Sequence, residues 1–110
     1  MANWTPACDA ADLADGEKRC LSIDDTPVVI SRVGDAVYAL HNECPHAGLP
    51  LGDGDLTGLV LTCPYHGYAY NVKSGKNIDW PDEEPPATTY PTKVEDGRVY
   101  VLIETADERR

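Results

Sequence analysis

Residues 26–40, TPVVISRVGDAVYAL, decide the fold class, because two runs rich in Val and Ile flank the pair Gly34-Asp35. This pattern predicts a β-hairpin, in which Gly34 supplies the positive φ that a two-residue turn demands. Residues 93–103 repeat the pattern around Asp96-Gly97, a dipeptide typical of a tight hairpin turn. The two segments therefore predict antiparallel strands near the middle and at the end of the sequence.

Outside the hairpins, short segments rich in Val, Ile, Thr and Tyr alternate with turn residues, which predicts an all-β protein. Residues 59–62 and 68–72 are expected to form short strands, and Ser74-Gly75-Lys76 a turn. Residues 1–20 are expected to contribute an edge strand and a loop around residues 12–16.

Two segments are rich in residues that interrupt regular structure. Residues 49–58 contain Pro50 and three glycines, a composition that connects elements rather than forming one. We expect this segment to give the loops on either side of it freedom to converge. Residues 78–91 contain four prolines, too many residues without an N–H donor for a central strand, and they predict a stiff surface loop.

The length of 110 residues predicts one domain, residues 1–110, with a single modest core. Phe is absent, so we expect the core to consist of Val, Leu, Ile and Tyr. The formal charge of −10 disfavours nucleic acid and anionic membranes as partners and favours basic protein surfaces. No apolar stretch approaches the roughly 20 residues of a membrane span, and no secretion signal is evident, so we expect a soluble cytoplasmic protein.

Two short motifs could bind a metal: Cys44-Pro45-His46 and, after sixteen further residues, Cys63-Pro64-Tyr65-His66. Each motif places one thiolate and one imidazole on a loop, which together form the donor set of a [2Fe-2S] cluster with sulfur on one iron and nitrogen on the other. Zinc also binds two Cys and two His, but zinc motifs commonly pair Cys with Cys and His with His. The mixed pairs favour the two-iron cluster, and a zinc-binding structural domain is the alternative.

The remaining cysteines, Cys8 and Cys20, have no histidine neighbours. Disulfides are not expected in a chain without a secretion signal, so we interpret both as small, partly buried residues. His41 is the only histidine outside the two motifs, and we expect it to lie on the surface at a strand end rather than to bind the metal.

The two motifs and their spacing resemble the signature of the Rieske iron–sulfur proteins. The segments VYALHNECPHAGLP (37–50) and YPTKVEDGRVYV (90–101) are similar to the flanking strand and the final hairpin of small Rieske ferredoxins. The resemblance implies a Rieske-like antiparallel β-sandwich with a small cluster-binding subdomain, about residues 41–77, formed by the two ligand loops.

The same resemblance implies that the cofactor is a [2Fe-2S] cluster in which Cys44 and Cys63 hold the buried iron and His46 and His66 hold the outer iron. No residue is expected to be catalytic. The respiratory and photosynthetic Rieske proteins have one further cysteine in each ligand loop, and this chain lacks both. It therefore looks like the soluble ferredoxins of bacterial ring-hydroxylating oxygenases.

Such a ferredoxin is a one-electron carrier and not an enzyme. It takes an electron from a flavin-dependent or iron–sulfur reductase and passes it to a terminal oxygenase, such as a monooxygenase or an aromatic-ring dioxygenase of hydrocarbon catabolism. We expect the carrier to be monomeric. The alternative is the small Rieske-like subunit of a nitrite reductase or of another redox complex, which would form a permanent assembly.

Three aromatic residues complete the predictions. High-potential relatives have a Ser two residues and a Tyr four residues after the second histidine, whereas this chain has Tyr68 and Tyr70 there. The missing Ser and the retained Tyr70 predict a midpoint potential in the lower half of the roughly −150 to +300 mV range. Trp80 is interpreted as a core or loop-anchoring residue, and contact of Trp80 and Pro81 with a partner is the less favoured alternative.

Overall fold

A computed structural model describes residues 3–23, 25–43, 50–64 and 67–103. In this part of the chain strands predominate and the only helices are two short 3-10 turns. The elements, in chain order, are β1 (Asn3–Asp9), η1 (Ala10–Asp12), β2 (Lys18–Ile23), β3 (Thr26–Val33), β4 (Ala36–His41), η2 (Leu51–Asp53), β5 (Asp55–Thr57), β6 (Val60–Thr62), β7 (Ala69–Asn71), β8 (Thr89–Tyr90), β9 (Thr92–Glu95) and β10 (Arg98–Ile103).

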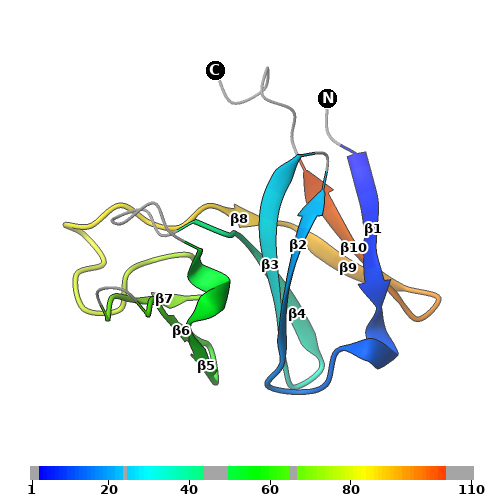
Figure 1. The fold of residues 1–110 in the computed structure, drawn as a ribbon, viewed down its shortest axis with the longest axis horizontal. Coiled ribbons are helices and arrows are strands. Elements are labelled where there is room, and N and C mark those ends of the chain that lie inside the picture. The colour runs from blue at the N-terminus through cyan, green and yellow to red at the C-terminus, as the bar shows by residue number, and fades with distance from the viewer. Residues whose placement is uncertain (1–2, 24, 44–49, 65–66, 104–110) are drawn as a thin grey trace.

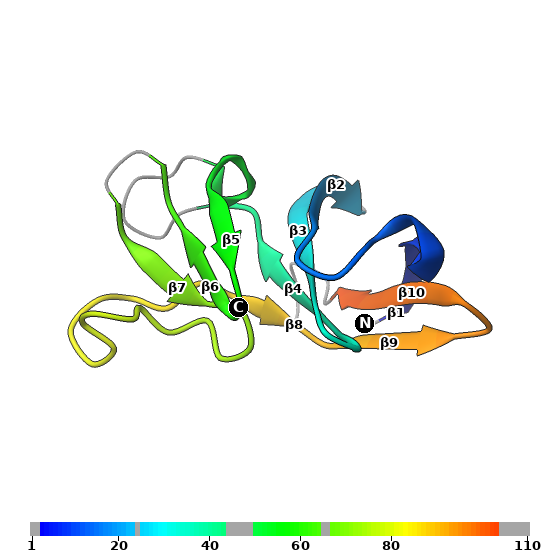
Figure 2. The same cartoon turned by 90° about the horizontal axis from the view of Figure 1, so that it is seen from below.

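The strands form three antiparallel sheets, with the orders β1-β10-β9, β2-β3-β4-β8 and β5-β6-β7. Figures 1 and 2 show the four-stranded sheet lying between the two smaller sheets. The all-β antiparallel fold predicted from the sequence is thereby confirmed. The sheet β5-β6-β7 forms one end of the molecule, and Cys63 directly follows its strand β6.

Strand β3 is buried on both faces because it lies in the middle sheet. Val28 and Ile30 pack in a core with Val101 and Ile103 of β10. Val29, on the opposite face, packs in a second core that includes residues of β6, β7 and η2. Successive side chains of β3 point to opposite faces of the sheet and so pack in two different cores. The largest buried hydrophobic side chains of these cores are Leu, Ile, Val and Tyr, as predicted.

Both predicted hairpins are confirmed. Strands β3 and β4 pair in antiparallel register around Gly34, which has a φ of 64°. Strands β9 and β10 pair around Asp96 and Gly97, whose φ values are 53° and 76°. Two consecutive residues with positive φ fit the right-handed twist of a tight hairpin, which explains the Asp-Gly dipeptide.

Three strands depart from the sequence predictions. Strand β2 was not predicted, because KRCLSI is largely polar and only Ile23 is buried. Strand β5 lies inside the segment 49–58 that was expected to connect elements without forming one. Strand β8 ends the proline-rich segment 78–91, where it adds an edge strand to β4. The rest of that segment is loop, and the predicted edge strand in residues 1–20 is β1.

None of the helices in the described ranges is long and apolar enough to cross a membrane.

Candidate metal centre

The second Cys-His motif begins where β6 ends. Cys63 follows Thr62 directly, its side chain is fully buried, and it belongs to the core that contains Val29. Its backbone N–H donates to the carbonyl of Tyr68 over 2.6 Å, and its own carbonyl accepts from Gly67 N–H over 3.0 Å. Gly67 has a φ of 72°, so a tight turn brings the chain back towards β7. This turn fixes both ends of the second ligand loop.

The first Cys-His motif lies in the connection between β4 and η2. Asn42 precedes it, and the Asn42 side-chain oxygen accepts a 2.7 Å hydrogen bond from Gly52 N–H on the far side of the motif. The backbone N–H of Asn42 donates to the carbonyl of Pro27 over 2.9 Å. Asn42 therefore closes the first loop and attaches it to the start of β3.

Gly52 and Gly54 hold the exit of the first loop against neighbouring elements. A Cβ at Gly52 would overlap the sulfur of Cys20, and a Cβ at Gly54 would overlap the carbonyl oxygen of Thr62. Thr62 directly precedes Cys63, so the two ligand loops emanate from backbone segments in direct contact. The sequence predicted glycines that give the loops freedom; the structure instead shows glycines required for close packing.

Of the predicted ligands, only Cys63 lies within the described residues. Cys44, His46 and His66 lie outside them. Among the described residues, no group of three or more His, Cys, Asp or Glu side chains could hold a metal ion elsewhere. The structure therefore offers no competing site in the part of the chain it describes.

The other two cysteines are separate from the motifs and are free thiols on β1 and β2. Burial raises the pKa of the Cys8 thiol, the Arg19 guanidinium opposes that rise, and the Asp12 and Asp9 carboxylates add to it. A thiol held in its protonated form is a poor metal ligand, because the thiolate is the species that coordinates. Cys20 is exposed and was expected to be partly buried, so that prediction is correct for Cys8 only.

The residues present fit a [2Fe-2S] cluster. A fully buried thiolate at Cys63 would be costly unless a cation lay beside it, and a coordinated ferric ion provides that charge. The sequence supplies one further thiolate and two imidazoles in the two loops, which completes the mixed donor set.

Comparison with known proteins decides the family. Residues 3–102 match the family model of the Rieske [2Fe-2S] domain. The chain belongs to the Rieske [2Fe-2S] family. The cofactor of this Rieske domain is a [2Fe-2S] cluster, and its activity is electron transfer rather than catalysis.

Two curated relatives are similar over nearly their whole length. Ferredoxin CarAc of Metapseudomonas resinovorans is 35% identical over 102 residues, which cover 92% of this Rieske domain and 94% of the relative. The 3-phenylpropionate/cinnamic acid dioxygenase ferredoxin subunit of Escherichia coli K12 is 35% identical over 102 residues, covering 91% of this chain and 93% of the relative.

Solved structures agree with this placement. A ferredoxin in complex with the oxygenase of carbazole 1,9a-dioxygenase superposes with a TM-score of 0.82 at 35% identity, covering 89% of this chain and 91% of the other. The Sphingomonas yanoikuyae B1 ferredoxin gives a TM-score of 0.83 at 28% identity, covering 93% of this chain and all of the other. A Mycobacterium tuberculosis structure, named for a nitrite reductase small subunit, gives 0.84 at 24% identity, which is a likeness of fold.

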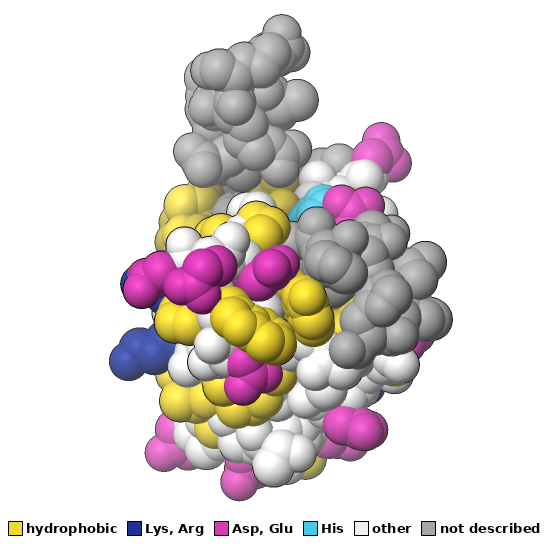
Figure 3. Space-filling model, turned by 90° about the vertical axis from the view of Figure 1, so that its left-hand side faces the viewer, with side chains coloured by type: hydrophobic (Ala, Val, Ile, Leu, Met, Phe, Trp, Pro, Cys, Tyr) yellow, Lys and Arg dark blue, Asp and Glu magenta, His cyan; other side chains and the backbone are white. Residues whose placement is uncertain are grey.

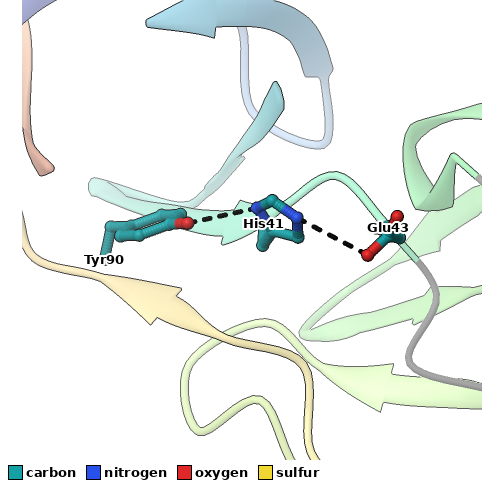
Figure 4. A network of polar contacts seen from close by, with 3 residues as sticks. All are labelled: His41, Glu43 and Tyr90. Carbon is teal, nitrogen blue, oxygen red and sulfur yellow. Dashed lines mark hydrogen bonds and ion pairs between the residues drawn. The ribbon is translucent and has the colours of Figure 1, made fainter. Parts of the chain in front are cut away.

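His41 forms a polar network beside the first ligand loop (Figure 4). Its Nδ1 lies 3.1 Å from the Tyr90 hydroxyl, and its Nε2 lies 3.7 Å from a carboxylate oxygen of Glu43. Both ring nitrogens thus face partners other than a metal. His41 is the last residue of β4, so the predicted position at a strand end is confirmed, although its side chain is only 27% exposed.

Of the three aromatic residues singled out in the sequence, Tyr70 and Tyr68 are at least partly buried, and Trp80 lies on the surface. Tyr70 of β7 is fully buried in the same core as Cys63, and Tyr68 is half-buried. Trp80 is 45% exposed, so it is not a core residue, and its interpretation as a loop-anchoring residue stays a prediction.

Sequence reasoning did not identify Asn42, Gly52 or Gly54 as residues that shape the site. Their roles come from contacts with residues ten or more positions away or from another strand. The one available signal was the position of Asn42, two residues before the first cysteine of the motif.

Proposed function

We propose that this Rieske domain carries single electrons from a reductase to a terminal oxygenase, with Cys44, His46, Cys63 and His66 as the cluster ligands. The burial of Cys63 at the head of the second loop carries the proposal, because a fully buried cysteine within the second Cys-His motif suits a cluster ligand. The relatives at 35% identity are ferredoxin components of oxygenase systems, which supports the oxygenase as acceptor.

When bound, the cluster supplies a one-electron couple whose potential depends on its ligands and hydrogen bonds. The chain provides the apolar surroundings and the hydrogen bonds that hold the second ligand loop. Tyr70 and the apolar core around Cys63 keep water from the cysteine side of the site. The turn from Cys63 to Tyr68 holds the second loop in place through backbone hydrogen bonds. A site fixed in this way needs little rearrangement when its charge changes.

The carrier is proposed to work as a monomer in the cytoplasm, with a flavin-dependent or iron–sulfur reductase as its electron donor. The free thiols of Cys8 and Cys20 suit a compartment that keeps cysteines reduced. The small subunit of a nitrite reductase is less well supported, because the likeness to such a protein is one of fold at 24% identity.

Cysteine variants test the ligand set. Cys44→Ser and Cys63→Ser should each lose iron, acid-labile sulfide and the visible absorbance, whereas Cys8→Ser and Cys20→Ser should retain all three. Electron paramagnetic resonance after dithionite reduction should show a cluster with mixed nitrogen and sulfur ligands in the wild type. Equal iron content in the Cys63→Ser and Cys20→Ser proteins would refute the proposed ligands.

A second measurement tests electron delivery. The reduced protein should be reoxidised by a terminal oxygenase in a single-turnover experiment, with one electron lost per cluster. A protein that holds the cluster but never reduces an oxygenase, and copurifies with a larger redox enzyme, would instead support a permanent subunit.

A further inference from the structure

An exposed aromatic pair lies at the ligand-loop end of the molecule. The rings of Tyr68 and Trp80 contact each other, with centroids 5.5 Å apart and planes tilted by 44°. Trp80 is 45% exposed and Ile78 is 42% exposed. We call Tyr68, Ile78, Trp80 and Pro81 the Trp80 patch.

The loop that presents Trp80 is internally braced. The side-chain oxygen of Asn77 accepts hydrogen bonds from the backbone N–H groups of Asp79 and Trp80, each over 2.9 Å. The Trp80 carbonyl accepts from the backbone N–H groups of Glu83 and Glu84, over 3.3 and 3.0 Å. Asn77 itself is 1% exposed, so the brace is anchored in the interior. The fold therefore holds a large apolar side chain in water, an arrangement typical of interaction sites.

The loop that carries the Trp80 patch is acidic, and the exposed Lys76 lies just before it. Asp79, Asp82 and Glu83 are exposed in the same loop, and no Lys or Arg occurs between residues 77 and 92. Figure 3 looks onto this end of the molecule and shows apolar side chains in the middle of the face with acidic side chains among and around them. Among the described side chains coloured in this view, Lys and Arg are prominent at its margin rather than in the middle of the face.

The patch lies close to Cys63, the one proposed cluster ligand among the described residues. Tyr68 is two residues after His66, and its carbonyl accepts the hydrogen bond from Cys63 N–H. A protein bound to the patch would therefore lie against the second ligand loop. Electron transfer requires such proximity between the two redox centres.

We infer that the Trp80 patch is the docking surface for a redox partner whose contact face has an apolar centre surrounded by Lys and Arg. This inference rests on the proposed function as an electron carrier. The acidic rim favours encounter with a basic protein, and the exposed indole supplies the buried anchor once the two have met. A second copy of this chain is the wrong occupant, because acidic rims would then face each other on molecules of net charge −10.

The test uses oxidised mitochondrial cytochrome c, a basic redox protein, as the probe. The dithionite-reduced ferredoxin is freed of excess reductant and mixed with cytochrome c at low ionic strength in a stopped-flow instrument. Trp80→Ala should lower the second-order rate constant about tenfold, the loss typical of one interface anchor, and Trp80→Tyr should restore part of it. Trp4→Ala is the matched control, because Trp4 is 41% exposed on β1 in another sheet. It should leave the rate constant unchanged.

A charge series tests the acidic rim. Asp82→Asn combined with Glu83→Gln should lower the rate constant and weaken its dependence on ionic strength. The control, Glu95→Gln with Asp96→Asn, removes two acids from the β9–β10 turn in another sheet and should have a clearly smaller effect. Equal effects of the two pairs would show that net charge alone steers the encounter, which would overturn the acidic rim as a docking element.

The outcomes separate this inference from the proposed function. Ferricyanide, a small oxidant that needs no docking face, should oxidise wild type and Trp80→Ala at equal rates. If the wild type holds no reducible cluster, the proposed function fails. If the wild type reduces cytochrome c and Trp80→Ala does so equally fast, the docking inference alone is refuted.

Discussion

The absence of a Cβ at Gly52 and Gly54 allows the backbone segments beside the two ligand loops to pack closely. A Cβ on Gly54 would overlap the backbone carbonyl of Thr62, and a Cβ on Gly52 would overlap the sulfur of Cys20. A backbone carbonyl held in a strand cannot move aside, whereas a cysteine side chain can change rotamer. The two glycines therefore differ in how far they tolerate a methyl group.

Gly54→Ala should destabilise the protein and release the cluster. The added Cβ overlaps the carbonyl of Thr62, so β5 and β6 must separate beside Cys63 at a cost of about 1–3 kcal/mol. Thermal unfolding followed at the visible absorbance of the cluster measures the change. Gly58→Ala is the control, because a Cβ there meets no atom within 4 Å and only its φ of 58° is strained. A Gly54→Ala protein more stable than Gly58→Ala would contradict the packing argument.

Asn42→Ala should speed the loss of iron to a chelator. The substitution removes the acceptor of the Gly52 N–H and opens the first ligand loop at its closure, with a loss of about 1–2 kcal/mol. Asn42→Asp keeps an acceptor oxygen at the same position and should retain iron nearly as long as the wild type. Absorbance decay in excess chelator gives both rates, and equal decay of Asn42→Ala and wild type would rule out a closing role for the side chain.

At the scale of elements, β3 connects the two halves of the molecule. Its consecutive valines are both fully buried but serve different cores, Val28 towards β10 and Val29 towards the core of Cys63. A cavity made in β3 should therefore disturb either the core that contains Cys63 or the core beside β10, depending on which valine is replaced.

Val28→Ala and Val29→Ala form a matched pair of substitutions. Each removes two methyl groups from a fully buried position, so both should lower the free energy of unfolding by about 2 kcal/mol. Only Val29→Ala should also accelerate cluster loss, because its cavity opens into the core that holds Cys63. Chemical denaturation gives the first quantity and chelator kinetics the second; identical cluster lifetimes in the two variants would disprove the division into two cores.

The elements that could be predicted from sequence are those specified by local chemistry. The turns are specified by the two-residue pairs Gly34-Asp35 and Asp96-Gly97, and the flanking strands follow from runs rich in Val, Ile and Tyr. Strand β2 could not be predicted, because its outer residues are polar and its pairing with β3 is a tertiary contact. Cys63 could be predicted as a ligand because its motif spans only four consecutive residues. Asn42 and Gly54 could not be predicted, because they act through contacts with residues distant in sequence.

At the scale of the whole molecule, the three sheets differ in how much support they have of their own. The strands β5, β6 and β7 have three residues each, too few for an independent sheet, whereas β1 and β10 pair along most of their length. The ligand-loop end should therefore depend on the cluster for stability, since metal binding adds directly to folding free energy.

Removal of the cluster should loosen one end of the molecule selectively. In hydrogen exchange of the iron-free protein, amides of β5, β6 and β7 should exchange much faster than in the iron-bound protein. Amides of β1 and β10 should change little, because the described residues of their core do not include Cys63 or its neighbours. Uniform acceleration in all three sheets would show a single cooperative unit that the cluster stabilises as a whole.

Asn3 at the start of β1 pairs with Ile103 at the end of β10, in the sheet at the opposite end of the molecule from β5-β6-β7. A reductase domain fused through a flexible linker beyond Ile103 would thus leave the face shown in Figure 3 unobstructed. Such a tether would raise the local concentration of the electron donor to the millimolar range, provided that the linker spans the molecule. The pairing of the first and last strands thereby makes this scaffold suited to self-sufficient redox chimeras.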